Sequence, residues 1–145
     1  MKWQSIFVVV AINLTGCTSM VLTPQPSSVD SEQATQATTG VSALDKLIAK
    51  GDSQRRQGQY AQAAATLERA LRLSPGSGAA YLALARVKLD QRHFREAQQL
   101  AEKSLSLAGQ SLYTQRQAWL VISHAKRQQG DINGANHAAK RAREL

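Results

Sequence analysis

The stretch that decides the fold runs from Gly58 to Pro75 and reads GQYAQAAATLERALRLSP. Pro75 ends a helix here, because its ring clashes with the preceding turn and it has no backbone N–H to donate. The small side chains of Ala63 and Ala70 leave room for a second helix to pack closely. The apolar residues recur at three- and four-residue spacing, which places them on one face of an amphipathic α-helix; they are Tyr60, Ala63, Ala64, Leu67, Ala70 and Leu71.

The same pattern returns twice, as HFREAQQLAEKSLSLAG from His93 and as DINGANHAAKRAREL from Asp131. Each copy is preceded by another amphipathic segment: SALDKLIAKGDSQRRQ, GAAYLALARVKLDQR and QRQAWLVISHAKRQQG. The first two pairs are offset by 34 residues and the last two by 38. The surplus is about one helical turn, so we expect a lengthened helix or connection around 108–115. The predicted helices are 43–57, 61–73, 79–91, 95–107, 112–129 and 133–143.

When the three helix pairs are aligned at these offsets, similar residues recur at equivalent positions, which we call columns. A 34-residue helix–turn–helix unit with such columns resembles the tetratricopeptide repeat. The resemblance covers about residues 42–145 and implies an all-α solenoid of about three repeats, at about 44–77, 78–111 and 116–145. It departs from the family pattern at Gly109, where a closing proline belongs, and at Ile122 and Ser123. The shared columns are Leu47, Tyr81 and Trp119; Gly51, Ala85 and Ser123; Gly58 and Gly130; Ala63, Ala97 and Ala135; and Ala70, Ser104 and Ala142.

The N-terminus, MKWQSIFVVVAINLTGC, has one basic residue, an apolar run and then small residues. This order is typical of a secretory signal peptide, which we assign to residues 1–16. Leu14 to Cys17 reads LTGC and resembles the bacterial lipobox, in which the cysteine is acylated and becomes the mature N-terminus. An ordinary buried cysteine is the alternative, and the place of Cys17 at the expected cleavage point argues against it. By the same resemblance, Thr18 in place of aspartate favours the outer membrane, with the chain facing the periplasm.

Residues 17–40 are rich in Thr, Ser, Gln and Pro and have few large apolar side chains. Such a composition cannot bury enough surface to offset the entropy of ordering, so we expect a flexible tether. Ser42, followed three residues later by Asp45, predicts a capping box that opens the folded domain at 41–145.

The sequence offers no sign of an enzyme, a cofactor or a metal site. The histidines (His93, His124 and His137) show neither an i,i+4 pair nor an HExxH motif. Phosphate-binding loops and nucleophile elbows are absent as well. Most acidic residues lie four positions from a basic residue on the same predicted helix, which predicts ion pairs along single helices. Binding is the remaining chemistry.

In tetratricopeptide arrays the first helix of each pair lines a concave groove, and this resemblance implies where a partner binds. Asp52 stands where some members carry an asparagine that clamps a C-terminal carboxylate, so capture of that kind is not expected. The leucines of the candidate partner-binding set form an apolar floor and the arginines form its edge. The set consists of Ile48, Asp52, Arg55, Arg56, Leu82, Arg86, Leu89, Leu120, His124 and Arg127. A wider set of first-helix positions in the groove adds Asp45, Ala49, Ala83, Asp90, Gln117, Val121 and Gln128.

The chain carries a formal net charge of +8, which favours acidic partners. Export would make nucleic acid an implausible partner. The small size, the tether and the three repeats resemble tetratricopeptide lipoproteins that activate a bifunctional penicillin-binding peptidoglycan synthase. Type IV pilus pilotins are a second possibility, although they carry about twice as many repeats. The third is a structural lipoprotein that binds cell-wall polymer directly through its basic surface.

Overall fold

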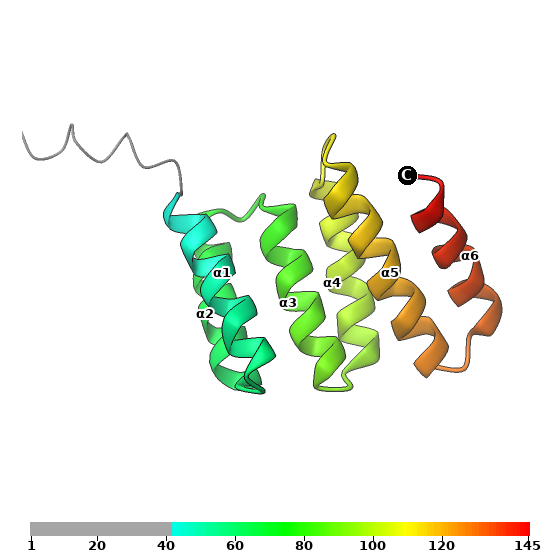
Figure 1. The fold of residues 1–145 in the computed structure, drawn as a ribbon, viewed down its shortest axis with the longest axis horizontal. Coiled ribbons are helices and arrows are strands. Elements are labelled where there is room, and N and C mark those ends of the chain that lie inside the picture. Colours follow the sequence, from blue (N-terminus) through cyan, green and yellow to red (C-terminus); the bar gives the residue numbers. More distant parts are fainter. Residues whose placement is uncertain (1–41) are drawn as a thin grey trace, which may run out of the picture. The chain divides into compact units, whose positions relative to one another are not determined.

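The computed structural model describes residues 42–145, and the predicted signal peptide, Cys17 and the predicted tether lie outside the described residues. The described part contains six α-helices and no strand (Figure 1). Each predicted helix end lies within one residue of the observed end. The helices are α1 (Ala43–Arg56), α2 (Tyr60–Leu73), α3 (Gly78–Asp90), α4 (Phe94–Leu107), α5 (Leu112–Gln128) and α6 (Ile132–Arg143).

Serine caps the first helix of each pair. The side chains of Ser42, Ser77 and Ser111 each accept a hydrogen bond from a backbone N–H in the first turn. At Ser42 the Asp45 carboxylate also accepts from the Ser42 N–H, which completes the predicted capping box. These bonds satisfy N–H groups that have no partner inside the helix.

The helices form three antiparallel pairs, α1 with α2, α3 with α4, and α5 with α6 (Figure 1). The first helices of neighbouring pairs also touch, because α3 packs against both α1 and α5. Within residues 42–145 the second helices α2, α4 and α6 do not contact one another. The first helices are therefore closer together than the second helices, and this difference curves the array. As a result, α1, α3 and α5 line its concave side.

The core is built mostly from alanine. Ala63, Ala97 and Ala135 share one repeat column and are completely buried. Gly51 of α1 faces Leu67 of α2, because a Cβ atom at Gly51 would lie 2.6 Å from Cγ of Leu67. Small side chains in these columns bring the paired helices close enough for dense packing.

The four-residue surplus belongs to α5. This helix has 17 residues and α3 has 13, a difference of four. The connections before them, residues 74–77 and 108–111, are equally long. The surplus is therefore one added turn at the N-terminus of α5 and not a longer loop.

Candidate partner-binding groove

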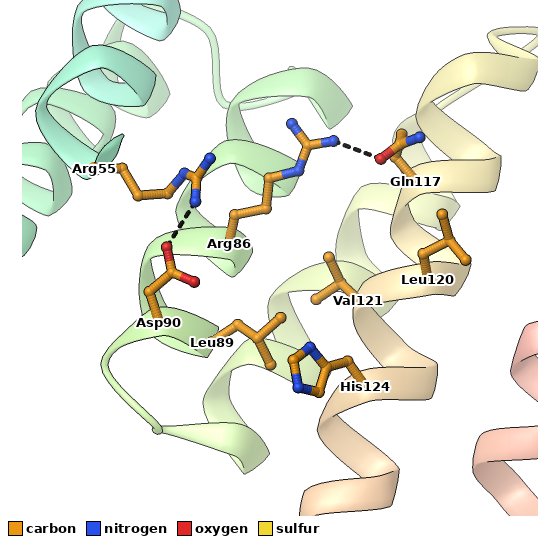
Figure 2. Close-up of a pocket in the computed structure, with 8 residues that line it drawn as sticks. All are labelled: Arg55, Arg86, Leu89, Asp90, Gln117, Leu120, Val121 and His124. Atoms are coloured by element: carbon orange, nitrogen blue, oxygen red, sulfur yellow. Dashed lines mark hydrogen bonds and ion pairs between the residues drawn. The ribbon is translucent and has the colours of Figure 1, made fainter. Parts of the chain in front are cut away.

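A groove of about 340 Å³ opens between α1, α3 and α5 (Figure 2). Its volume is at the lower end of the range for small-molecule pockets, which also suits one or two side chains of a partner. Its lining combines cationic, apolar and amide groups, and consists of Arg55, Arg86, Leu89, Asp90, Gln117, Leu120, Val121 and His124.

At one side of the groove, Arg55 ties the first repeat to the second. Its Nη1 donates to Oδ2 of Asp90 at 2.6 Å, and its Nε lies 3.5 Å from Oδ1 of Asp52. Burial lowers the pKa of Arg55, but the hydrogen bond and charge of Asp90, together with Asp52, outweigh burial and hold that pKa above its ordinary value. Two carboxylates thus neutralise this guanidinium.

On the other side, Arg86 of α3 reaches toward α5. Its Nη2 donates to Oε1 of Gln117 at 2.8 Å (Figure 2). Gln117 is neutral, and within residues 42–145 no carboxylate forms an ion pair with Arg86. The positive charge of Arg86 is therefore available to an incoming anion.

Between Arg86 and His124 the surface is apolar. Leu89 and Val121 form its floor, and Leu120 is 45% exposed. His124 is exposed at the far end (Figure 2). An apolar surface beside an uncompensated cation can hold an apolar side chain and an anionic group at the same time.

Comparison with known proteins identifies the architecture. A family model described as tetratricopeptide repeat matches residues 54–120, from the end of α1 into α5. The structure is similar to the globular C-terminal domain of LpoP from P. aeruginosa, with a TM-score of 0.66 and 33% sequence identity. That similarity covers 69% of this chain and 94% of the LpoP domain.

The chain belongs to the tetratricopeptide repeat family. A search of curated protein sequences finds no match.

Half of the predicted partner-binding set lines this tetratricopeptide groove. The residues that do so are Arg55, Arg86, Leu89, Leu120 and His124. The other three lining residues, Asp90, Gln117 and Val121, belong to the wider set of first-helix positions. The signal that found all eight was the resemblance to tetratricopeptide arrays, which implies that the first helix of each pair lines the groove; repeat phase then gave the equivalent positions.

Two apolar residues of the predicted set belong to the core instead. Leu82 is only 3% exposed and packs with Ala85, Ala101 and Ile122. Its assignment to the groove floor was wrong, because α3 is central and contacts α1, α2, α4 and α5. Ile48 is half-buried against the cluster around Leu67, so it does not line the groove either.

The remaining predicted residues lie beside the groove. Asp52 pairs with Arg55, and Arg56 is exposed outside the lining. Arg127 is exposed on α5, three residues beyond His124. None of these three residues lines the groove.

The described residues contain no group of three or more His, Cys, Asp or Glu side chains placed to hold a metal ion. Across 42–145, no helix has the length and apolar character that crossing a bilayer requires. His93, His124 and His137 are all exposed.

Proposed function

We propose that this protein is an outer-membrane lipoprotein whose tetratricopeptide domain activates a bifunctional penicillin-binding peptidoglycan synthase in the periplasm. The observation that carries the proposal is the similarity to the LpoP domain, which extends over 94% of that domain at 33% identity. The domain shares its fold with the LpoP domain, and the whole sequence resembles tetratricopeptide lipoproteins that activate such synthases. It acts by binding and not by catalysis.

The groove supports a binding role. Its apolar surface is open, and the Arg86 charge beside it is not neutralised by a carboxylate of residues 42–145. A protein partner that covers this surface would exclude water from the leucines and bring a carboxylate to Arg86, which gives both affinity and orientation. Acylation at Cys17 would hold the domain at the membrane, and residues 17–40 would let it reach the synthase.

The test measures glycan polymerisation by the purified synthase with and without the acyl-free domain. The groove variant is Arg86→Glu/Arg127→Glu. The control is Arg69→Glu/Arg72→Glu on α2, whose residues are exposed and away from the groove. Both variants change the net charge by the same amount, so only the location of the change differs.

We expect the wild-type domain and the α2 control to stimulate the synthase, and the groove variant to lose most of the stimulation. Thermal unfolding of each variant verifies that the fold is intact. Absence of stimulation by the wild-type domain would contradict the synthase proposal. Equal loss in both variants would mean that overall charge, and not the groove, attracts the partner.

Direct binding of cell-wall polymer is the second candidate, and the net charge of +8 favours it. Co-sedimentation with purified peptidoglycan separates the two. A polymer-binding protein would sediment with the polymer at low salt, would be released at high salt, and would respond equally to both charge variants.

A further inference from the structure

The added turn of α5 displays two large apolar side chains to solvent. Leu112 is 55% exposed and Tyr113 is 66% exposed. The turn itself is well anchored, because Ser111 Oγ accepts from the Thr114 N–H and Gln115 Nε2 donates to the Gly109 carbonyl at 2.6 Å. The exposed tyrosine is therefore held on a rigid support.

The α5 residues beside the groove and those of the added turn lie on the same side of the helix. At about 100° per residue, positions seven apart lie within about 20° of each other, so Tyr113, Leu120 and Arg127 share one line along α5. Gln117 and His124, which line the groove, lie within about 60° of Leu120 around the helix and so beside that line. The line runs for about 21 Å at 1.5 Å per residue and extends at both ends beyond the groove-lining residues of α5, which lie between Gln117 and His124.

This side of the array is positively charged. The α5 helix contains no Asp or Glu. Arg116 and Arg127 are exposed on it, and within residues 42–145 neither forms an ion pair with a carboxylate. Arg86 reaches from α3 toward α5, where the neutral Gln117 accepts its hydrogen bond (Figure 2). The positive charge of Arg55, by contrast, is balanced by the carboxylates of Asp52 and Asp90.

We propose that Tyr113, Leu120 and Arg127 form a docking stripe along α5 that, with Arg86 opposite, binds an amphipathic acidic segment of a protein partner. The occupant follows from the chemistry of the stripe. A purely anionic polymer would use the arginines but would leave Tyr113 and Leu120 in water. A segment with apolar side chains on one face and carboxylates beside them satisfies both parts. Tyrosine and arginine also carry a large share of the energy at protein interfaces.

The inference rests on the proposed function only in taking the partner to be a protein. Beyond the proposed function, it specifies that the partner binds along α5 and that the bound segment is amphipathic and acidic. It also assigns a role to the added turn, because without that turn α5 would begin after Tyr113.

The first experiment is photo-cross-linking with the full-length chain in its own cells. Benzoylphenylalanine replaces Tyr113 in one strain and Leu73 in the other. Leu73 is 60% exposed at the end of α2 and is not in the stripe, so it controls for nonspecific capture by an exposed apolar residue. We expect a protein adduct at position 113 and little or none at 73. Equal adducts at both positions, or none at either, would overturn the proposal.

The second experiment titrates the captured protein, once identified and purified, with wild-type domain, Tyr113→Ser and Leu73→Ser. Both substitutions are at exposed positions, and melting curves show whether each variant is folded. We expect Tyr113→Ser to raise Kd about tenfold or more and Leu73→Ser to leave Kd unchanged. Wild-type affinity for Tyr113→Ser would refute the docking stripe.

The identity of the adduct separates this inference from the proposed function. A penicillin-binding synthase at position 113 supports both. A different protein that passes the titration supports the docking stripe and contradicts the synthase proposal.

Discussion

At the scale of single residues, the turns between paired helices share one geometry. Gly58 and Gly130 adopt positive φ angles of 74° and 85°, and Arg92 occupies the equivalent position with φ of 66°. After each of them, the next N–H bonds to a carbonyl five residues earlier, as in His93 N–H to the Lys88 carbonyl at 2.9 Å. Glycine is the preferred residue at a helix C-terminus of this geometry. A residue with a Cβ atom in this left-handed conformation costs about 1–2 kcal/mol of folding free energy.

Arg92→Gly should therefore stabilise the protein. The relief of strain exceeds the extra entropy of glycine in the unfolded chain, and we expect a gain of about 0.5–1 kcal/mol in the free energy of unfolding. Urea denaturation measures it. The reciprocal change Gly130→Arg should lose stability, because a Cβ there meets nothing within 4 Å and only the backbone conformation opposes it. A loss of stability in Arg92→Gly would show that its side chain contributes more than the strain costs.

Asp131 caps α6 and bridges to α5. Its carboxylate accepts from Lys126 Nζ and from the Gly134 N–H, each at 2.8 Å. The hydrogen bond from Lys126, and then the bond from Gly134, hold the pKa of Asp131 below its ordinary value of 3.8. The folded state thus releases this proton more readily than the unfolded state does.

This lowered pKa predicts a pH dependence with a definite sign. The contribution of Asp131 is present above its unfolded pKa and is lost as pH falls through the folded value. Asp131→Asn retains a capping side chain but removes the charge, so its thermal midpoint should fall less steeply than that of wild type between about pH 5 and pH 3. Parallel melting curves across this range would contradict the assignment.

At the scale of elements, the distance between paired helices depends on the alanine column. Ala63, Ala97 and Ala135 are completely buried. In the third pair, Ser123 Oγ donates to the Ala135 carbonyl at 2.8 Å, which shows how closely α5 approaches α6. Space for additional methylene groups is lacking at such crossings.

Ala97→Leu should overpack the crossing of α3 and α4 and lower the free energy of unfolding by about 1–3 kcal/mol. Ala65→Leu is the matched control, because Ala65 is exposed on α2. The control should change the thermal midpoint little. If both variants melt like wild type, the helices of this pair are not held at the distance that the structure shows.

At the scale of the whole molecule, the folded domain is basic and its proposed anchor precedes it in the sequence. Cys17 is the only cysteine in the chain and the only candidate for acylation, so Cys17→Ser should leave the protein unprocessed or released into the periplasm. Membrane fractionation followed by immunoblotting measures this. Tight membrane association of the variant would reject lipid attachment at this residue.

The sequence alone determined the elements and their pairing. The six helices were predicted to within one residue because their signals are local: apolar period, the Ser42 cap, turn glycines and Pro75. The 34-residue offset then predicted the repeat, since equal units stack in the same way. The surplus before Trp119 was located by this offset, but a longer helix and a longer loop fit it equally well, and only the structure showed the added turn of α5.

Only the tertiary structure decided which first-helix residues are buried and which charges pair. Leu82 and Leu120 occupy the same repeat position, yet Leu82 is 3% exposed and Leu120 is 45% exposed. The difference arises because α3 has a first helix on each side and α5 has one only on the α3 side. We expected ion pairs along single helices, and this expectation was wrong for the ion pair with the shortest N–O distance. That pair, Arg55–Asp90 at 2.6 Å, joins α1 to α3. Helix period determines the face on which a residue lies, whereas burial and pairing depend on what the stacking of repeats places against that face.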